Sequence, residues 1–261
     1  MKAALLRFLR RFLDVTRLGL LPVRVRGGIA QGARWTLFPC SAYWRGTHEP
    51  AMHDSMLALG DIRGWVCWDL GAHYGIYGIG LARRVGPTGQ VAAFEPNPLS
   101  YARLERHWRM NRLGWMKLYR AAVSDTAGTA EFYTYGDSAS TTTHLPYEGE
   151  ARVVEATPIV VPLVVLDELV ARGELRAPDF IKVDVEGHGH RALAGARQAI
   201  ATKRPILIVA IHSDLELSSV IALLEPLGYT WQRIATDSGV ADAMSGDLLF
   251  TPKPAQAAAS G

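Results

Sequence analysis

The sequence predicts an α/β protein built on a mostly parallel sheet. Short apolar runs alternate with stretches of helical periodicity, which is the pattern of strands joined by crossover helices. The clearest unit spans residues 65–97: an apolar run ends at Leu70, a glycine-bearing turn follows, a helical pattern covers Ile76–Val85, and a second apolar run covers Val91–Phe94. The 261 residues, 49% of them hydrophobic, are enough to bury one large core.

The turn after the first of these strands carries the first candidate ligand-binding residues. Gly71 and Gly75 let the backbone bend and let a ligand lie against bare amide groups. Glu95 ends the second strand. Because ligands of open α/β sheets bind beyond the carboxyl ends of the strands, this carboxylate is placed to accept hydrogen bonds from two ribose hydroxyls. The alternative is that Glu95 is only a surface acid.

The charge at this turn favours one ribose ligand over another. A dinucleotide site uses G-x-G-x-x-G after the first strand, whereas this chain has G-A-H-Y-G, with Asp69 just before it. A carboxylate at that position would repel a pyrophosphate and suit a cationic ligand. The residues therefore indicate S-adenosylmethionine, which carries an ammonium and a sulfonium group, unless Asp69 only caps a turn.

Strands and helices continue to alternate along the rest of the chain. Asn97 at the N-cap and Pro98 at the first helical position begin a helix that runs to Asn111. Residues 129–161 indicate an antiparallel hairpin with a polar loop at 137–143. Further strands are expected within residues 23–44 and at Lys117–Ala122, Phe180–Asp184, Ile206–Ile211, Tyr229–Ile234 and Asp247–Thr251, the last two as an antiparallel pair. Further helices are expected at Ala51–Leu59, from Leu166 to about Gly173, and at Leu215–Leu227.

The end of the strand Phe180–Asp184 carries the candidate catalytic groups. Asp184 lies at its carboxyl end, and Glu186, His188 and His190 follow at every second residue. A carboxylate or imidazole here could take a proton from a substrate hydroxyl. Alternatively, Asp184 with His188 or His190 could hold a divalent ion that lowers the hydroxyl pKa. Since D-x-E-x-H-x-H is not a recognised metal spacing, no metal is predicted.

Five runs of residues, in order along the chain, resemble the FkbM-type methyltransferase family. They are DLGAHYGIYG, AFEPNP, AAVSD, LDEL and IKVDVEGHGHRALAGA, and the similarity covers residues 49–212. The resemblance implies a Rossmann-like methyltransferase fold, with helices on both faces of a seven-stranded, mostly parallel sheet. It also implies S-adenosylmethionine as methyl donor and O-methylation of a hydroxyl on a small molecule, sugar, glycan or natural product.

The same resemblance implies roles for individual residues. Ser124 and Asp125 match a pattern near the adenine ring, although they could form an ordinary turn. Glu49 stands where the family has a glutamate before the first core strand, where it faces the cleft or only starts a helix. The implied cofactor-binding set is Asp69, Gly71, Ala72, His73, Gly75, Glu95, Pro96, Ser124 and Asp125. The expected substrate contacts are Glu49, Glu186 and His188.

Two acids of the family pattern are missing. Gly189 stands where a second glutamate is expected, and Ala210 stands where the next strand often carries one. His190 and His212 lie one and two residues further on. Because histidine is a competent base near neutral pH, we expect these two residues to act with Asp184 in removing the proton. The missing acids also motivate another possibility, a catalytically silent scaffold that binds the cofactor.

The sequence divides into an N-terminal extension at 1–45, a methyltransferase domain at 46–252 and a disordered tail at 253–261. Residues 1–21 have an apolar face and a basic face, which suits docking on the protein body or, alternatively, peripheral contact with an anionic membrane. No run reaches the eighteen apolar residues of a membrane span. With two cysteines and no disulfide framework, we expect a cytoplasmic protein.

The charge distribution bears on partners. A second alternative, an RNA methyltransferase, is motivated by a basic stretch around the helix at 98–111. This stretch contains Arg103, Arg106, Arg109, Arg112, Lys117 and Arg120. The net charge is only +3, and arginine runs usually face water, so a nucleic-acid partner is not expected. The sequence leaves a homo-oligomer open.

Overall fold

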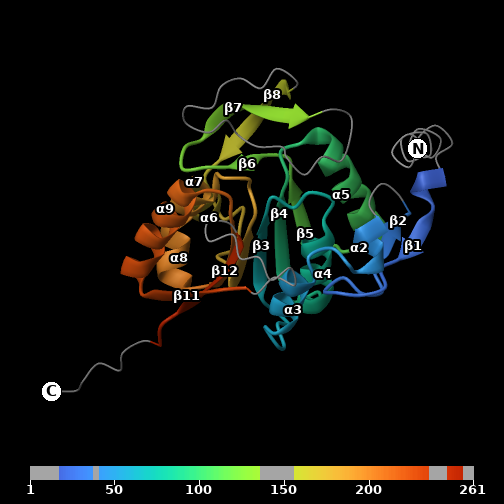
Figure 1. Ribbon diagram of the computed structural model, residues 1–261, viewed down its shortest axis with the longest axis horizontal. Helices are drawn as coiled ribbons and strands as arrows, with labels where there is room; N and C mark the ends of the chain where they lie inside the picture. The colour runs from blue at the N-terminus through green and yellow to red at the C-terminus, as the bar shows by residue number, and fades with distance from the viewer. Residues whose placement is uncertain (1–17, 38–40, 136–155, 235–245, 255–261) are drawn as a thin grey trace.

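The computed structural model describes residues 18–37, 41–135, 156–234 and 246–254 (Figure 1). Its centre is a seven-stranded sheet in the order β11-β12-β10-β9-β3-β4-β5. The strands of this sheet are β3 (Val66–Leu70), β4 (Gln90–Phe94), β5 (Met116–Tyr119), β9 (Phe180–Val183), β10 (Ile206–Ile211), β11 (Tyr229–Arg233) and β12 (Gly246–Pro252). Adjacent strands are parallel except where β12 pairs with β10 and β11. The predicted α/β fold with a mostly parallel sheet is confirmed.

Helices cover both faces of the sheet (Figure 1). The helices are α2 (Ser41–Arg45), α3 (Pro50–Leu57), α4 (Ile76–Val85), α5 (Pro98–Asn111), α6 (Leu166–Ala171), α7 (Gly189–Ala194), α8 (Arg197–Lys203) and α9 (Asp214–Leu224), with short 3-10 turns η1 (Leu18–Leu20) and η2 (Glu225–Leu227). Side chains alternate along β3, so Cys67 packs in the core under α4 and α5, and Trp68 packs in the core under α6 to α9. This double coverage explains why β3 is buried throughout.

The ends of three central strands are joined at the point where the strand order reverses. The chain runs outward from β3 to β5 and then returns to β9 on the other side of β3. The amides of Gly71 and Ala72 both donate to the carbonyl of Phe94, and the amide of Asp184 donates to Leu70. The carboxyl ends of β3, β4 and β9 therefore form one edge, where open sheets of this kind bind ligands.

One predicted strand is divided between two sheets. The segment expected at Lys117–Ala122 forms β5 in the main sheet, and the chain then leaves for β6 (Ala122–Val123). The division follows from the length of β4: it ends at Phe94, so a longer β5 would have no partner for its backbone. β6 joins β7 (Gly128–Tyr135) and β8 (Ala156–Val164) in a three-stranded sheet, which contains the predicted hairpin.

The N-terminal part confirms the expected short strands and adds a helix. β1 (Pro22–Arg24) and β2 (Arg34–Thr36) form a hairpin, and α2 follows at the end of the segment in which short strands and turns were expected. The Asn111 side chain bonds the amide and the carbonyl of Arg34 at 2.8 Å each, which fixes the hairpin on α5. The predicted basic helix (apart from η1), the loop at 137–143 and the end of the tail lie outside the described residues. Within the described part of the chain, no helix is long and apolar enough to cross a membrane.

Candidate functional site

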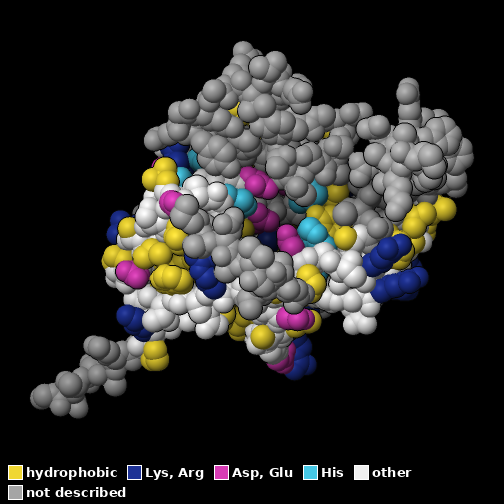
Figure 2. Space-filling view, in the orientation of Figure 1, with side chains coloured by type: hydrophobic (Ala, Val, Ile, Leu, Met, Phe, Trp, Pro, Cys, Tyr) yellow, Lys and Arg dark blue, Asp and Glu magenta, His cyan; other side chains and the backbone are white. Residues whose placement is uncertain are grey.

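A cavity of about 480 Å³ opens at the joined ends of the central strands. Figure 2 shows acidic and histidine side chains gathered at this hollow in the middle of the visible face. The lining residues come from the ends of β3, β4, β9 and β10, the start of β12, β7 and the segment before α3. They are Tyr43, His48, Glu49, Gly71, His73, Glu95, Pro96, Phe132, Asp184, Glu186, Ala210, Ile211, His212, Gly246 and Asp247.

The cavity wall is strongly acidic. Five of its residues carry carboxyl groups and three carry imidazoles, whereas none of the described lining residues is a lysine or arginine. Burial, followed by the nearby Glu49 and Asp184, raises the pKa of Asp247 to about 6. A hollow lined by one sign of charge attracts ligands of the opposite sign. The arginines of α5 do not line it.

Glu95 is held in place by the backbone and faces the cavity. It is 5% exposed, and one oxygen accepts from the amide of His73 at 2.7 Å while the other accepts from Asn97 at 2.8 Å. Burial raises the pKa of Glu95 to about 7, although these two hydrogen bonds oppose the rise. Because an ionised carboxylate has about four acceptor positions, Glu95 can still accept two hydroxyl groups from a ligand.

The turn after β3, whose His73 amide binds Glu95, depends on glycine. Gly71 has φ of +80°, and a Cβ at this residue would lie 1.8 Å from the carbonyl oxygen of Asp184. Gly75 has φ of +90° and begins α4. Three of the predicted cofactor-binding residues of this region line the cavity: Gly71, His73 and Pro96. Two others, Ala72 and Gly75, shape the turn without lining the cavity.

Asp69 lies behind the cavity wall, which differs from the predicted contact with a cationic ligand. Its side chain is 0% exposed, and Oδ1 is 3.7 Å from Nζ of Lys182, which is 1% exposed. The cause is the alternation along β3, which turns Asp69 toward α4, where a Cβ on Gly78 would lie 2.8 Å from its Oδ2. The acidic charge that faces the cavity comes from other residues.

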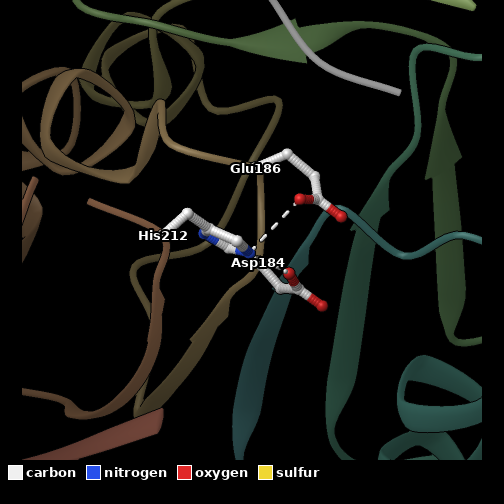
Figure 3. Close-up of side chains that lie close together, drawn as sticks. All are labelled: Asp184, Glu186 and His212. Atoms are coloured by element: carbon white, nitrogen blue, oxygen red, sulfur yellow. Dashed lines mark ion pairs between the residues drawn. The ribbon is translucent and has the colours of Figure 1, made fainter. Parts of the chain in front are cut away.

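Three predicted side chains converge on the opposite wall. Figure 3 shows Asp184, Glu186 and His212 pointing toward one another from the end of β9 and the end of β10. Nε2 of His212 lies 3.6 Å from Oδ1 of Asp184 and 3.4 Å from Oε2 of Glu186. Glu186 reaches this place from a turn in which its own φ is +49°, followed by Gly187 at +83°. We refer to these three residues as the Asp–Glu–His cluster.

The charge states of the Asp–Glu–His cluster are coupled to its neighbours. Burial raises the pKa of Asp184, but the ammonium of Lys182 at 3.2 Å and the nearby His212 outweigh it, so the pKa is lowered. Burial opposes protonation of His212, but Glu216, Glu186 and Asp184 outweigh it and raise its pKa. The cluster therefore combines an ionised carboxylate with an imidazole that readily holds a proton.

Glu216, which no sequence motif indicates, supports this cluster from behind. It is 1% exposed on α9, accepts from the amides of Gly189 and His212 at 2.7 and 2.8 Å, and places Oε2 3.4 Å from Nδ1 of His212. A Cβ on Gly189 would lie 2.6 Å from Oε1 of Glu216. The carboxylate of Glu216 thus occupies the space beside Gly189, the residue at which an acid was expected. Its position at i+4 from His212 on a helix start was the available signal.

Four other predicted residues lie outside the cavity. His188 bonds Oγ of Ser124 at 3.1 Å, and burial lowers the pKa of His188 to about 4. Asp125 pairs with Arg191 at 2.8 Å. His190 lies near His188, with ring centroids 6.1 Å apart, and is not part of the Asp–Glu–His cluster. None of these four residues lines the cavity, so their expected roles stay predictions. These roles are catalysis for His190, substrate contact for His188, and adenine contact for Ser124 and Asp125.

The wall before α3 was only partly anticipated. Glu49 lines the cavity and accepts from the hydroxyl of Tyr77 at 2.5 Å; it is also the N-cap residue of α3, although its side chain does not cap that helix. Tyr43, which no motif singled out, donates to or accepts from Nδ1 of His73 at 2.9 Å. Burial lowers the pKa of His73 to about 4, which keeps its imidazole neutral.

Comparison with known proteins identifies relatives of this architecture. The methyltransferase FkbM domain matches residues 69–230. The hexuronic acid methyltransferase AglP of Haloferax volcanii is 30% identical over 159 residues, covering 61% of this chain and 61% of that protein. The 31-O-demethyl-FK506 methyltransferase FkbM of Streptomyces tacrolimicus is 26% identical over 237 residues, covering 81% of this chain and 86% of its own length.

A solved structure shares the fold. The crystal structure of methyltransferase FkbM from Methylobacillus flagellatus superposes with a TM-score of 0.52 at 20% identity. The superposition covers 74% of this chain and 45% of the crystallised chain. The match thus spans less than two thirds of both that protein and the haloarchaeal relative.

Proposed function

This chain belongs to the FkbM methyltransferase family, and on that basis we propose that it transfers a methyl group from S-adenosylmethionine to a hydroxyl of a sugar, glycan or natural product. The names of two relatives, one acting on a hexuronic acid and one on a demethylated FK506, support an oxygen acceptor of this class. The observation that carries the proposal is the buried Glu95 carboxylate facing the same acidic cavity as the Asp–Glu–His cluster.

The residues present fit the cofactor. Glu95 keeps acceptor positions free for both ribose hydroxyls, and Gly71 lies beside it without a side chain to block the approach. Pro96 and Phe132 offer apolar surface for a purine. The carboxylates of the wall complement a ligand with a sulfonium and an ammonium group. Although one relative is named for a hexuronic acid, the acidic wall of this chain favours a neutral acceptor, because it would repel the carboxylate of a uronic acid.

The chain supplies positioning and proton removal. When bound, S-adenosylmethionine supplies a methyl group on a sulfonium, which leaves as the neutral thioether of S-adenosylhomocysteine. Glu95 and the turn at Gly71 fix one reactant, and the opposite wall fixes the hydroxyl, so that holding them in line contributes much of the rate. Transfer of this methyl group to the hydroxyl oxygen would break its bond to sulfur. The hydroxyl proton would pass to a carboxylate of the Asp–Glu–His cluster, so that the products are a neutral ether and a neutral thioether.

A methyl-transfer assay tests this proposal. The protein is incubated with S-adenosylmethionine and a panel of neutral hexosides, hexuronosides and macrolide alcohols, and products are analysed by mass spectrometry. We expect S-adenosylhomocysteine together with a methyl ether of at least one acceptor, with neutral sugars preferred. Cofactor binding without product from any acceptor would instead support the silent scaffold.

The affinity for the cofactor should depend on pH through Glu95. Only the carboxylate accepts hydrogen bonds from both ribose hydroxyls, and burial raises the pKa of this group to about 7. We therefore expect the dissociation constant of S-adenosylhomocysteine, measured by calorimetry, to rise about tenfold from pH 8 to pH 6, with most of the rise below pH 7. In Glu95→Gln the affinity should be weaker and the slope absent. An equally steep dependence in the variant would assign the titration to another group.

A further inference from the structure

We propose that Asp184, Glu186 and His212 bind one divalent transition-metal ion in the cavity. Two carboxylates and one imidazole form a donor set that suits such ions. Each side chain offers one ligand atom, and these atoms all lie within 4.8 Å of one another. The proposed role of the ion, contact with the acceptor hydroxyl, rests on the proposed function, whereas binding of the ion does not.

The two distances from His212 to the carboxylates match those between ligands of one ion. Nε2 of His212 is 3.4 Å from Oε2 of Glu186 and 3.6 Å from Oδ1 of Asp184. Two ligand atoms that each lie about 2.1 Å from an ion, at a tetrahedral angle, are about 3.4 Å apart. A small movement of side chains therefore suffices for all three to reach a common ion. Figure 3 shows the three groups directed at the same space.

Glu216 and Lys182 lie behind the Asp–Glu–His cluster and contact it as groups that orient metal ligands do. A metal-bound histidine usually has a carboxylate at its other ring nitrogen. Here Oε2 of Glu216 lies 3.4 Å from Nδ1 of His212, while Nε2 is the nitrogen near Asp184 and Glu186. Lys182 lies 3.2 Å from Oδ2 of Asp184, which leaves Oδ1 on the side of the cluster. Glu216 is fixed by two backbone amides, so this support is rigid.

The ion would explain how a site without two of the family's acids activates a hydroxyl. The site offers three protein ligands, and since the cluster lines an open cavity, further positions around the ion stay accessible. A hydroxyl oxygen bound at such a position loses its proton more easily, because the ion stabilises the negative oxygen. The imidazole ligand favours Mn²⁺ or Zn²⁺ over Mg²⁺, with Zn²⁺ the tighter of the two.

Ion binding is measured on full-length protein freed of metal with EDTA and dialysed. Mn²⁺ is titrated at neutral pH, and free Mn²⁺ is followed by its electron paramagnetic resonance signal, while Zn²⁺ is titrated by calorimetry. We expect one site per chain, with Zn²⁺ bound more tightly than Mn²⁺ and Mg²⁺ bound weakest. His212→Ala and Glu186→Gln should each weaken Mn²⁺ binding at least tenfold, and Glu216→Gln should weaken it about 10–100-fold.

Glu168→Gln is the matched control for Glu186→Gln, because it makes the same chemical change at an exposed residue of α6 outside the Asp–Glu–His cluster; it should bind Mn²⁺ as the unaltered chain does. No saturable binding of Mn²⁺ or Zn²⁺ to the unaltered protein would overturn the inference, as would binding that none of the three substitutions changes. S-adenosylhomocysteine is titrated into the same metal-free sample. If S-adenosylhomocysteine binds but no metal ion does, the metal site is refuted and the proposed function stands. If S-adenosylhomocysteine does not bind, the proposed function is refuted.

Discussion

Asp184→Asn is expected to slow methyl transfer by on the order of 10²–10⁴-fold while changing the affinity for S-adenosylhomocysteine only a few-fold. The substitution keeps the shape of the side chain and removes its charge. That charge is on the cavity wall opposite Glu95, where the acceptor hydroxyl must lose its proton. The carboxylate either takes the proton or binds an ion, and a neutral amide can do neither. The measurement is single-turnover methyl transfer with saturating cofactor, alongside calorimetry.

The control for this prediction is Asp54→Asn, which makes the same chemical change at an exposed residue of α3. It should turn over at the rate of the unaltered protein. A loss of less than about threefold in Asp184→Asn would remove the Asp–Glu–His cluster from the chemistry. A parallel loss of cofactor affinity would show that Asp184 acts in binding instead.

Lys182→Met is expected to lower the free energy of unfolding by about 3–5 kcal/mol, because it leaves a buried carboxylate without its cation. Lys182 and Asp69 are 1% and 0% exposed, and their charged atoms lie 3.7 Å apart in the middle of the sheet. Burial raises the pKa of Asp69, while Asp184 and Asp69 together outweigh burial and raise the pKa of Lys182. The positive charge of Lys182 therefore offsets the cost of burying the carboxylates of Asp69 and Asp184. Urea unfolding followed by tryptophan fluorescence measures the effect.

Two further variants separate lost charge from lost packing. Lys182→Met combined with Asp69→Asn removes both charges and should recover part of the loss, which a purely steric effect would not allow. Arg63→Met breaks an exposed pair with Asp61 and should leave the unfolding midpoint almost unchanged. Equal midpoints for Lys182→Met and Arg63→Met would contradict the account of the buried pair.

The fold could be predicted because its elements follow local rules. α4 begins after Gly75 and ends at Val85 as its periodicity indicates, and α5 begins after the Asn97 cap, whose side chain accepts from Leu99. β3 and β10 appear as buried apolar runs of the expected lengths. The end of a strand is not predicted where it depends on the neighbouring strand. β5 ends beside the end of β4, and no residue in 117–122 indicates that end point.

The candidate site could be predicted only in part, for a related reason. Gly71, Glu95 and Asp184 stand at strand ends, and the parallel sheet brings strand ends together. The direction of a side chain is harder to predict from sequence than its place in a strand. Asp69 is one residue away from the strand end and faces α4 instead of the cavity. Glu216 reaches the site from a helix 27 residues beyond Gly189, so only the packing of α9 on α7 reveals it.

Titration of S-adenosylhomocysteine and S-adenosylmethionine into the protein by calorimetry, at pH 8, tests the central claim most directly. We expect one site per chain, and an affinity at least tenfold weaker in Glu95→Ala, because hydrogen bonds to a charged group contribute about 1.5–3 kcal/mol each. Glu95→Gln, which keeps the side-chain volume, guards against a loss caused by misfolding and should weaken binding in the same direction. If neither compound binds, or if both variants bind as tightly as the unaltered protein, Glu95 and its cavity are not the methyl-donor site.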